Sequence, residues 1–128
     1  MFELTINGQV CKFNFGMGFL RDMNKKVTVP VEGMPGVKRD VGFRYSLVRL
    51  LDGDTETLVD ILDAANKGQE PRLTRMALDS FVDDANTDIE TVFDDVLGFL
   101  KTANATKKTV LQVVESLEEA KKKAEAEQ

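Results

Sequence analysis

The chain has 128 residues, enough for one domain with a modest core and too few for two. Its hydrophobic content of 42% is ordinary for a folded protein, its apolar runs are too short to span a bilayer, and no secretory leader pattern opens the sequence. A lone cysteine, Cys11, fits a reducing cytoplasm, and the lack of histidine removes the usual general base and the commonest metal ligand. These features favour a role without a catalytic, metal or cofactor site.

The net charge of −5 is unevenly distributed along the chain. Residues 1–51 carry 8 Lys/Arg against 4 Asp/Glu, residues 52–95 carry 3 against 13, and residues 96–128 carry 6 against 5. An acidic middle argues against general binding to nucleic acid, which needs Lys and Arg against phosphate. A basic first part beside an acidic second part suits head-to-tail contact between copies or contact with a basic partner. A solvated acidic surface that only prevents aggregation explains the same charges.

The first predicted element is a β-hairpin in FELTINGQVCKFNF, residues 2–15. Asn7-Gly8 favours a type I′ turn, because both central positions of that turn need a positive φ. A two-residue loop sets Phe2 opposite Phe13, and strand alternation then gives one apolar face. That face contains Phe2, Leu4, Ile6, Cys11, Phe13 and Phe15. Because so short a hairpin is only marginally stable alone in water, we expect helices to cover it.

Residues 27–41 are the segment that the sequence determines least. A short helical pattern, GFLRDMNKK at residues 18–26, precedes it. Val27, Val29 and Val31 then alternate as in a strand, whereas Pro30 restricts any such strand to the edge of a sheet. The turn-like GMPG follows. We expect either a third, irregular strand or an ordered loop.

Helical patterns occupy the rest of the chain. Asp54 is the predicted N-cap of a helix that Gly68 ends, and Thr74 is the predicted cap of the next. Thr87 and Glu90 have the spacing of a capping box before a further helix. The predicted fold class is therefore α+β: the hairpin, with or without a third irregular strand, packed on a bundle of four to five helices as one domain over residues 1–117.

The last helical segment carries an apolar stripe. Its members are Val110, Leu111, Val113, Val114 and Leu117. If the earlier helices already close the core, this stripe is left for another chain, as a helix laid in a groove. The alternative is that it packs on its own domain. No large apolar residue follows Leu117, so we expect residues 118–128 to form a frayed or disordered tail.

One metal site needs consideration, a degenerate calcium loop. Asp84, Asn86, Asp88 and Asp95 fall at positions one, three, five and twelve of an EF-hand loop. Ile89 occupies the position that requires glycine, and the twelfth residue is Asp rather than a bidentate Glu. Helix capping by Thr87 and acids near a helix N-terminus explain the same residues. A calcium-binding regulator is therefore the lesser alternative.

Several short blocks resemble one protein family. L-T-I-N-G followed by F-N-F-G-M-G-F-L-R-D-M-N-K-K resembles the opening of the tail assembly chaperones of long, flexible-tailed bacteriophages and prophages. L-L-D-G-D, L-V-D-I-L, L-T-R with F-V-D-D, and K-T-A-N-A-T-K-K follow in that family's order. The resemblance extends to about Leu117 and is weakest over residues 27–41. None of these blocks is a catalytic signature.

The resemblance implies a non-enzymatic role in assembling the phage tail. Such chaperones coat the tape measure protein, keep it soluble, and leave before the virion is complete. The expected location is the host bacterial cytoplasm, with absence from the mature virion. The expected partners are the tape measure protein and further copies of this chain, with the tail tube protein as an additional candidate and neither nucleic acid nor membrane. A structural head–tail or tail component retained in the virion is the alternative.

Two sets of residues are candidates for these contacts. For the tape measure protein, we expect the stripe from Val110 to Leu117 to be the binding surface. For contact between copies, we expect a basic set to face the acidic middle of the next chain. That set is Lys38, Arg39, Arg44 and Arg49.

Overall fold

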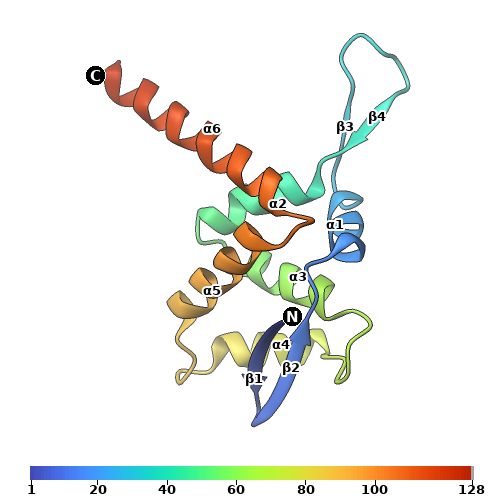
Figure 1. Ribbon diagram of the computed structural model, residues 1–128, viewed down its shortest axis with the longest axis vertical. Coiled ribbons are helices and arrows are strands. Elements are labelled where there is room, and N and C mark those ends of the chain that lie inside the picture. Colours follow the sequence, from blue (N-terminus) through green and yellow to red (C-terminus); the bar gives the residue numbers. More distant parts are fainter. Residues whose placement is uncertain (128) are drawn as a thin grey trace.

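The computed structural model describes residues 1–127, which fold into six helices and two separate two-stranded antiparallel sheets (Figure 1). The helices are α1 (Met17–Asn24), α2 (Gly42–Leu51), α3 (Thr55–Asn66), α4 (Arg75–Asp83), α5 (Ile89–Thr102) and α6 (Lys107–Ala126). The strands are β1 (Phe2–Ile6), β2 (Gln9–Phe13), β3 (Thr28–Pro30) and β4 (Lys38–Asp40). The predicted α+β class is confirmed, with one helix more than the upper expectation of five.

The N-terminal hairpin has the predicted turn and register. Asn7 and Gly8 both have positive φ, 54° and 73°, and Phe2 pairs with Phe13 across the ladder. Five of the six side chains of the predicted apolar face are buried, and the sixth, Leu4, is half-buried. The end of β2 is tied to the helical body, because the Asn14 amide donates to the Ala65 carbonyl of α3 at 2.8 Å. The hairpin is covered as expected.

Helix α3 lies at the centre of the core. The N-cap prediction is confirmed, because the Asp54 carboxylate accepts a hydrogen bond from the Thr57 amide at 3.3 Å. From this start the apolar stripe runs along one side of the helix, and Leu58, Ile61 and Leu62 are fully buried. β2, α1, α2 and α4 all contact α3. The core therefore depends on this helix more than on any sheet.

Helices α1 and α2 approach each other closely at Gly42. A Cβ at this position would lie 1.8 Å from the Met23 carbonyl oxygen, so only glycine fits. Beside it, the Asn24 side chain accepts a hydrogen bond from the Phe43 amide at 3.1 Å, which satisfies one of the free amides at the start of α2. This junction fixes the base of the segment that projects between the two helices.

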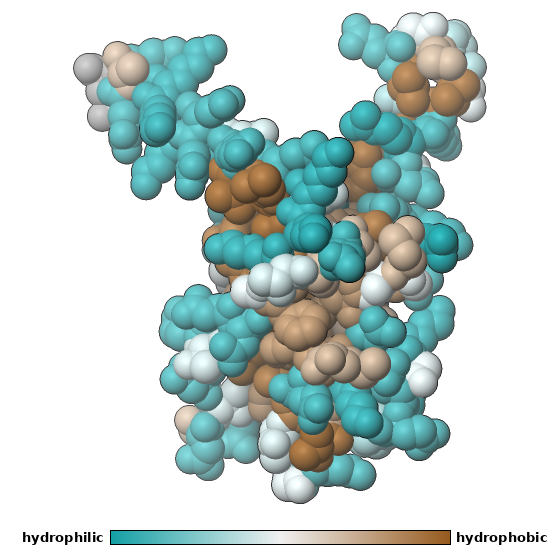
Figure 2. All heavy atoms as spheres, viewed as in Figure 1, coloured by the Kyte–Doolittle hydropathy of each residue, from teal (hydrophilic) through white to brown (hydrophobic). Residues whose placement is uncertain are grey.

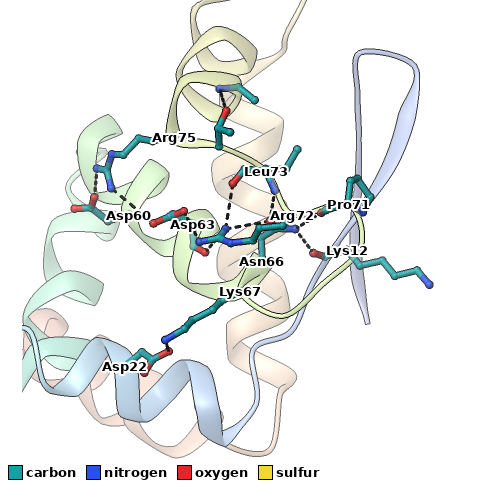
Figure 3. A network of polar contacts seen from close by, with 12 residues as sticks. Lys12, Asp22, Asp60, Asp63, Asn66, Lys67, Pro71, Arg72, Leu73 and Arg75 are labelled. Carbon is teal, nitrogen blue, oxygen red and sulfur yellow. Dashed lines mark hydrogen bonds and ion pairs between the residues drawn. The ribbon is translucent and has the colours of Figure 1, made fainter.

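A buried polar network joins the hairpin to the connection between α3 and α4 (Figure 3). Asn66 is fully buried. Its side-chain amide donates to the carbonyls of Lys12 and Pro71, at 3.0 and 3.2 Å, and its side-chain oxygen accepts from the Leu73 amide at 2.6 Å. Arg72 also donates to this oxygen, at 3.1 Å. One side chain thus satisfies three backbone groups, one in β2 and two in the connection between α3 and α4.

The cap of α5 differs by one residue from the sequence expectation. Thr74 caps α4 as predicted, through its hydroxyl and the Ala77 amide. The N-cap of α5, however, is Asp88, which accepts from the Thr91 amide at 3.2 Å. The predicted cap, Thr87, instead donates its hydroxyl to the Phe81 carbonyl at 2.7 Å, so it closes the preceding helix. The capping-box prediction at Thr87 was wrong.

Residues 27–41 form an arm that projects from the body (Figure 1). β3 and β4 pair with each other, with Val29 opposite Arg39, and every residue of both strands is exposed. The pairing continues beyond the strands, because the Val31 amide donates to the Val37 carbonyl at 2.9 Å. Pro30 is compatible with this sheet because both of its strands are edges. The third strand expected from the sequence exists, and it has a partner of its own.

Helix α6 packs on α2 and α5 and then leaves the body (Figure 1). It continues to Ala126, and its described side chains beyond Val114 are all exposed. The expected domain end at residue 117 and the frayed tail over 118–128 stay predictions, and residue 128 lies outside the described part. No helix within residues 1–127 is long and apolar enough to cross a membrane.

Candidate protein-binding surfaces

The apolar stripe of the last helix is divided between core and surface. Val110 and Val113 are buried against the body, and Val114 is half-buried. Leu111 and Leu117 are 60% and 40% exposed. One side of α6 therefore closes this domain's own core, and the other side presents leucines to solvent. That these leucines bind another chain stays a prediction.

The exposed side of this stripe belongs to a groove between the end of α5 and the start of α6. We call it the lysine-rimmed groove; its residues are Lys101, Lys107, Lys108, Val110, Leu111 and Val114. The hollow measures about 600 Å³. Three of its lining residues are aliphatic, and none of the three lysines makes an ion pair within residues 1–127. Such a groove suits an apolar side chain flanked by acidic groups.

Figure 2 shows hydrophobic side chains at several places, among them the point where α6 leaves the body and the tip of the arm. On the arm, strand alternation and the Val31–Val37 pairing put Val29, Val31, Val37 and Arg39 on one face. Val37 is 42% exposed, and Met34 in the turn is 54% exposed. The outer half of α6, in contrast, is mostly hydrophilic in this view.

The four basic residues expected to contact another copy do not form a single patch. Lys38 and Arg39 are exposed on the arm. Arg44, on α2, donates to the Gln112 side chain of α6 at 2.9 Å, although it lines a hollow at the base of the arm together with Arg39. Arg49 is engaged within its own chain. Its guanidinium pairs with Asp54 and lies 5.8 Å from the centre of the Tyr45 ring. Only the arm pair is free for a partner.

The Arg49–Asp54 pair has an electrostatic consequence for the helix cap. The hydrogen bond from Arg49 lowers the pKa of the Asp54 carboxyl below its ordinary value, and the same bond raises the pKa of Arg49. The charged carboxylate therefore both caps α3 and holds the end of α2. Arg49 is therefore engaged within its own chain.

A second groove, between α3 and α4, has the opposite charge. We call it the acidic groove; its residues are Thr55, Glu56, Val59, Asp60, Arg75, Asp79, Val82 and Asp83. Arg75 pairs with Asp60 across it. Within residues 1–127, Glu56, Asp79 and Asp83 make no ion pair. The acidic middle of the sequence thus supplies a recess with apolar residues between unpaired carboxylates.

Two of the carboxylates of the calcium loop considered from the sequence accept local hydrogen bonds. The Asp84 carboxylate accepts from the Asn86 amide at 2.9 Å, and Asp88 caps α5. Among the described residues, no three His, Cys, Asp or Glu side chains are grouped to hold a metal ion. The buried Cys11 thiol has a raised pKa, caused by its burial, and a protonated thiol is a poor nucleophile.

Sequence reasoning missed both grooves. The lysines come from two helices separated by a turn, and the acidic groove combines the first turns of α3 with residues along α4 from its first to its last. The signal for the first was the K-T-A-N-A-T-K-K block, which sets Lys101 and Lys107–Lys108 on either side of a helix break. The spacing alone did not show which apolar residues lie between them.

A known protein family matches most of this chain. The family described as "Phage tail assembly chaperone protein, TAC" matches residues 3–115. The match includes the hairpin, the arm, both grooves and the first turns of α6, and it ends before Leu117. Comparisons with curated proteins and with solved structures found no match.

Proposed function

The chain belongs to the phage tail assembly chaperone family, and from this premise we propose that it binds the tape measure protein and keeps it soluble while the tail is built. The chain acts by offering surface to another polypeptide, without a catalytic step. It works in the host bacterial cytoplasm, several copies associate along one client, and it is absent from the mature virion. The tail tube protein is an additional candidate partner.

The observation that carries this proposal is the lysine-rimmed groove. The core of the domain is closed by Val110 and Val113, so Leu111 and Leu117 serve no packing role within the chain. Exposed leucines beside free lysines match an amphipathic client helix with acidic residues next to its apolar face. The client segment we expect is therefore helical, apolar on one side and acidic beside it.

Co-expression with tape measure fragments tests this function. The wild-type chain should bring a fragment into the soluble fraction and co-purify with it. Leu111→Asp combined with Leu117→Asp should abolish the complex, because both substitutions place a carboxylate on the apolar surface the client must bury. Since both side chains are already exposed, the variant should keep its fold, as circular dichroism would verify.

A matched control separates the groove from surface hydrophobicity in general. Met76, on α4, is 77% exposed and lies outside both grooves. Met76→Asp should leave the complex intact. If the double leucine variant binds the client as well as the wild type does, the groove is not the client site.

Retention in the virion distinguishes the alternative function. A structural head–tail or tail component would be recovered at constant stoichiometry from purified particles, whereas a chaperone would appear only in infected-cell lysate. Quantitative mass spectrometry of both samples measures the difference. Recovery of this chain from finished particles would favour the structural role.

A further inference from the structure

The arm lacks the cover that the N-terminal hairpin has. Every residue of β3 and β4 is exposed, and Val29, Met34 and Val37 present apolar surface at its outer part. A two-stranded hairpin alone is marginally stable in water, and three-residue strands make few ladder bonds to offset its loss of conformational entropy. Contiguous apolar surface on such an element is typical of a docking site.

We propose that the arm of one copy docks in the acidic groove of the next copy. The inference deepens the self-association included in the proposed function by naming the two surfaces and their polarity. The arm presents Val29, Val31 and Val37 together with Arg39 on one face. The valines lie over Val59 and Val82 of the acceptor, and the guanidinium reaches the carboxylates around them.

A second copy of this chain fits the acidic groove because the charges of the two surfaces are complementary. Arg39, on the docking face, and its neighbour Lys38, on the opposite face, make no ion pair within residues 1–127, and neither do Glu56, Asp79 and Asp83 of the acidic groove. Docking would pair Arg39 with these carboxylates while excluding water from the valines, so that the charges fix the register and the apolar contact adds affinity. The lysine-rimmed groove has the same sign of charge as Arg39 on the docking face and is a poor acceptor for that face.

The positions of the two surfaces decide what kind of assembly results. The arm projects from one end of the long axis, and α4, which forms one wall of the acidic groove, lies at the other end (Figure 1). A contact between two different surfaces is heterologous, and it continues as an open chain unless its rotation closes a ring. An open chain of copies leaves every lysine-rimmed groove available, which suits a long client.

Charge reversal on each side provides the test, measured by sedimentation velocity over a range of concentrations without client. Lys38→Glu with Arg39→Glu, and separately Asp79→Lys with Asp83→Lys, should each weaken association about tenfold or more, because like charges then face each other. The chain that carries all four reversals should associate again, because the signs are once more complementary. Rescue by reversal is a result that misfolding cannot give.

Two controls complete the design. Lys121→Glu with Lys122→Glu makes the same charge change on the exposed outer part of α6 and should leave association unchanged. Met34→Asp removes apolar character from the exposed tip without touching a charge pair, and it should weaken association while the circular dichroism spectrum stays the same.

Three outcomes would overturn the inference. A wild-type chain that remains monomeric at every concentration has no such contact. Loss of association in the arm variant alone, with the groove variant unaffected, would mean that arms pair with each other. A four-reversal chain that fails to associate would refute the specific pairing. In each case client co-purification still reports on the lysine-rimmed groove, so failure here is distinguishable from failure of the proposed function.

Discussion

The two β-hairpins of this chain share the same alternation of apolar side chains, but one is buried against helices and the other is exposed to solvent. β1–β2 lays an apolar face over α3 and α5, where Phe2 and Phe99 rings are 5.5 Å apart and edge-on. β3–β4 alternates valines in the same way, yet within residues 1–127 no other element buries it. The difference shows that an apolar strand face predicts burial, but it does not predict whether the same chain or another one buries it. The first hairpin is part of the core, and the second is available for assembly.

Amide hydrogen exchange should show the largest contrast between the two hairpins. Amides of the β1–β2 ladder should exchange only through global unfolding, whereas those of β3–β4 open locally, on the order of a thousandfold faster or more. The amides of residues 118–127 should exchange as fast as those of the arm if the tail frays. Equal protection of the amides of both hairpins against exchange, in a dilute and monomeric sample, would show that the arm is as stable as the N-terminal hairpin.

Truncation of one large side chain on each hairpin should reproduce the contrast in stability. Phe13→Ala removes a fully buried ring, so we expect a loss of about 3–5 kcal/mol in the free energy of unfolding. Val37→Ala, on the exposed arm, should change it by less than about 0.5 kcal/mol. Urea denaturation of both variants measures the difference. A comparable loss for Val37→Ala would show that the arm is buried in the monomer.

The polar connection that holds the first hairpin can be broken separately. Asn66→Ala leaves the Lys12 carbonyl and the Leu73 amide without their partner, and an unsatisfied buried group costs about 1–3 kcal/mol. The exposed Asn104→Ala is the matched control and should be neutral. Thermal denaturation followed by far-ultraviolet circular dichroism measures the change, because the chain contains no Trp whose fluorescence could report unfolding. An unchanged melting temperature for Asn66→Ala would mean that the backbone groups of the network find other hydrogen-bond partners.

The smallest expected effect is the pH dependence of the junction between α2 and α3. The pKa of Asp54 is lower in the folded chain, because Arg49 donates to its carboxylate. Its contribution to stability is therefore present above the unfolded pKa and is lost as pH falls through the folded pKa. Asp54→Asn keeps a side-chain cap for Thr57 but removes the charge.

Comparing the free energy of unfolding of the wild type and Asp54→Asn across pH isolates the contribution of the Asp54 charge. The variant should be slightly less stable than the wild type at neutral pH, and the gap should close in acid as Asp54 becomes protonated. Urea denaturation at several pH values measures it. A gap that persists below the folded pKa would assign the loss to the cap geometry instead of the ion pair.

Much of the fold followed from adjacent residues, because turns and caps depend on local chemistry. Asn7-Gly8 predicted the turn, and through it the pairing of all five residues of each strand. Asp54 and Thr74 predicted two helix starts that the structure confirms. Where a side chain had two local options, the prediction failed: Thr87 bonds backward to Phe81, so the cap passes to Asp88. Both options satisfy the same few backbone groups, and only packing chooses between them.

The sequence by itself determined the family resemblance, the N-terminal hairpin and the helical character of the rest. Only the tertiary structure decided which side of the last helix is buried, that Arg49 is held within its own chain, and that lysines from two helices line one groove with Leu111. The physical reason is the range of the interactions. A turn or a cap is made by neighbours along the chain, whereas a groove is made by residues that meet only after the core has closed.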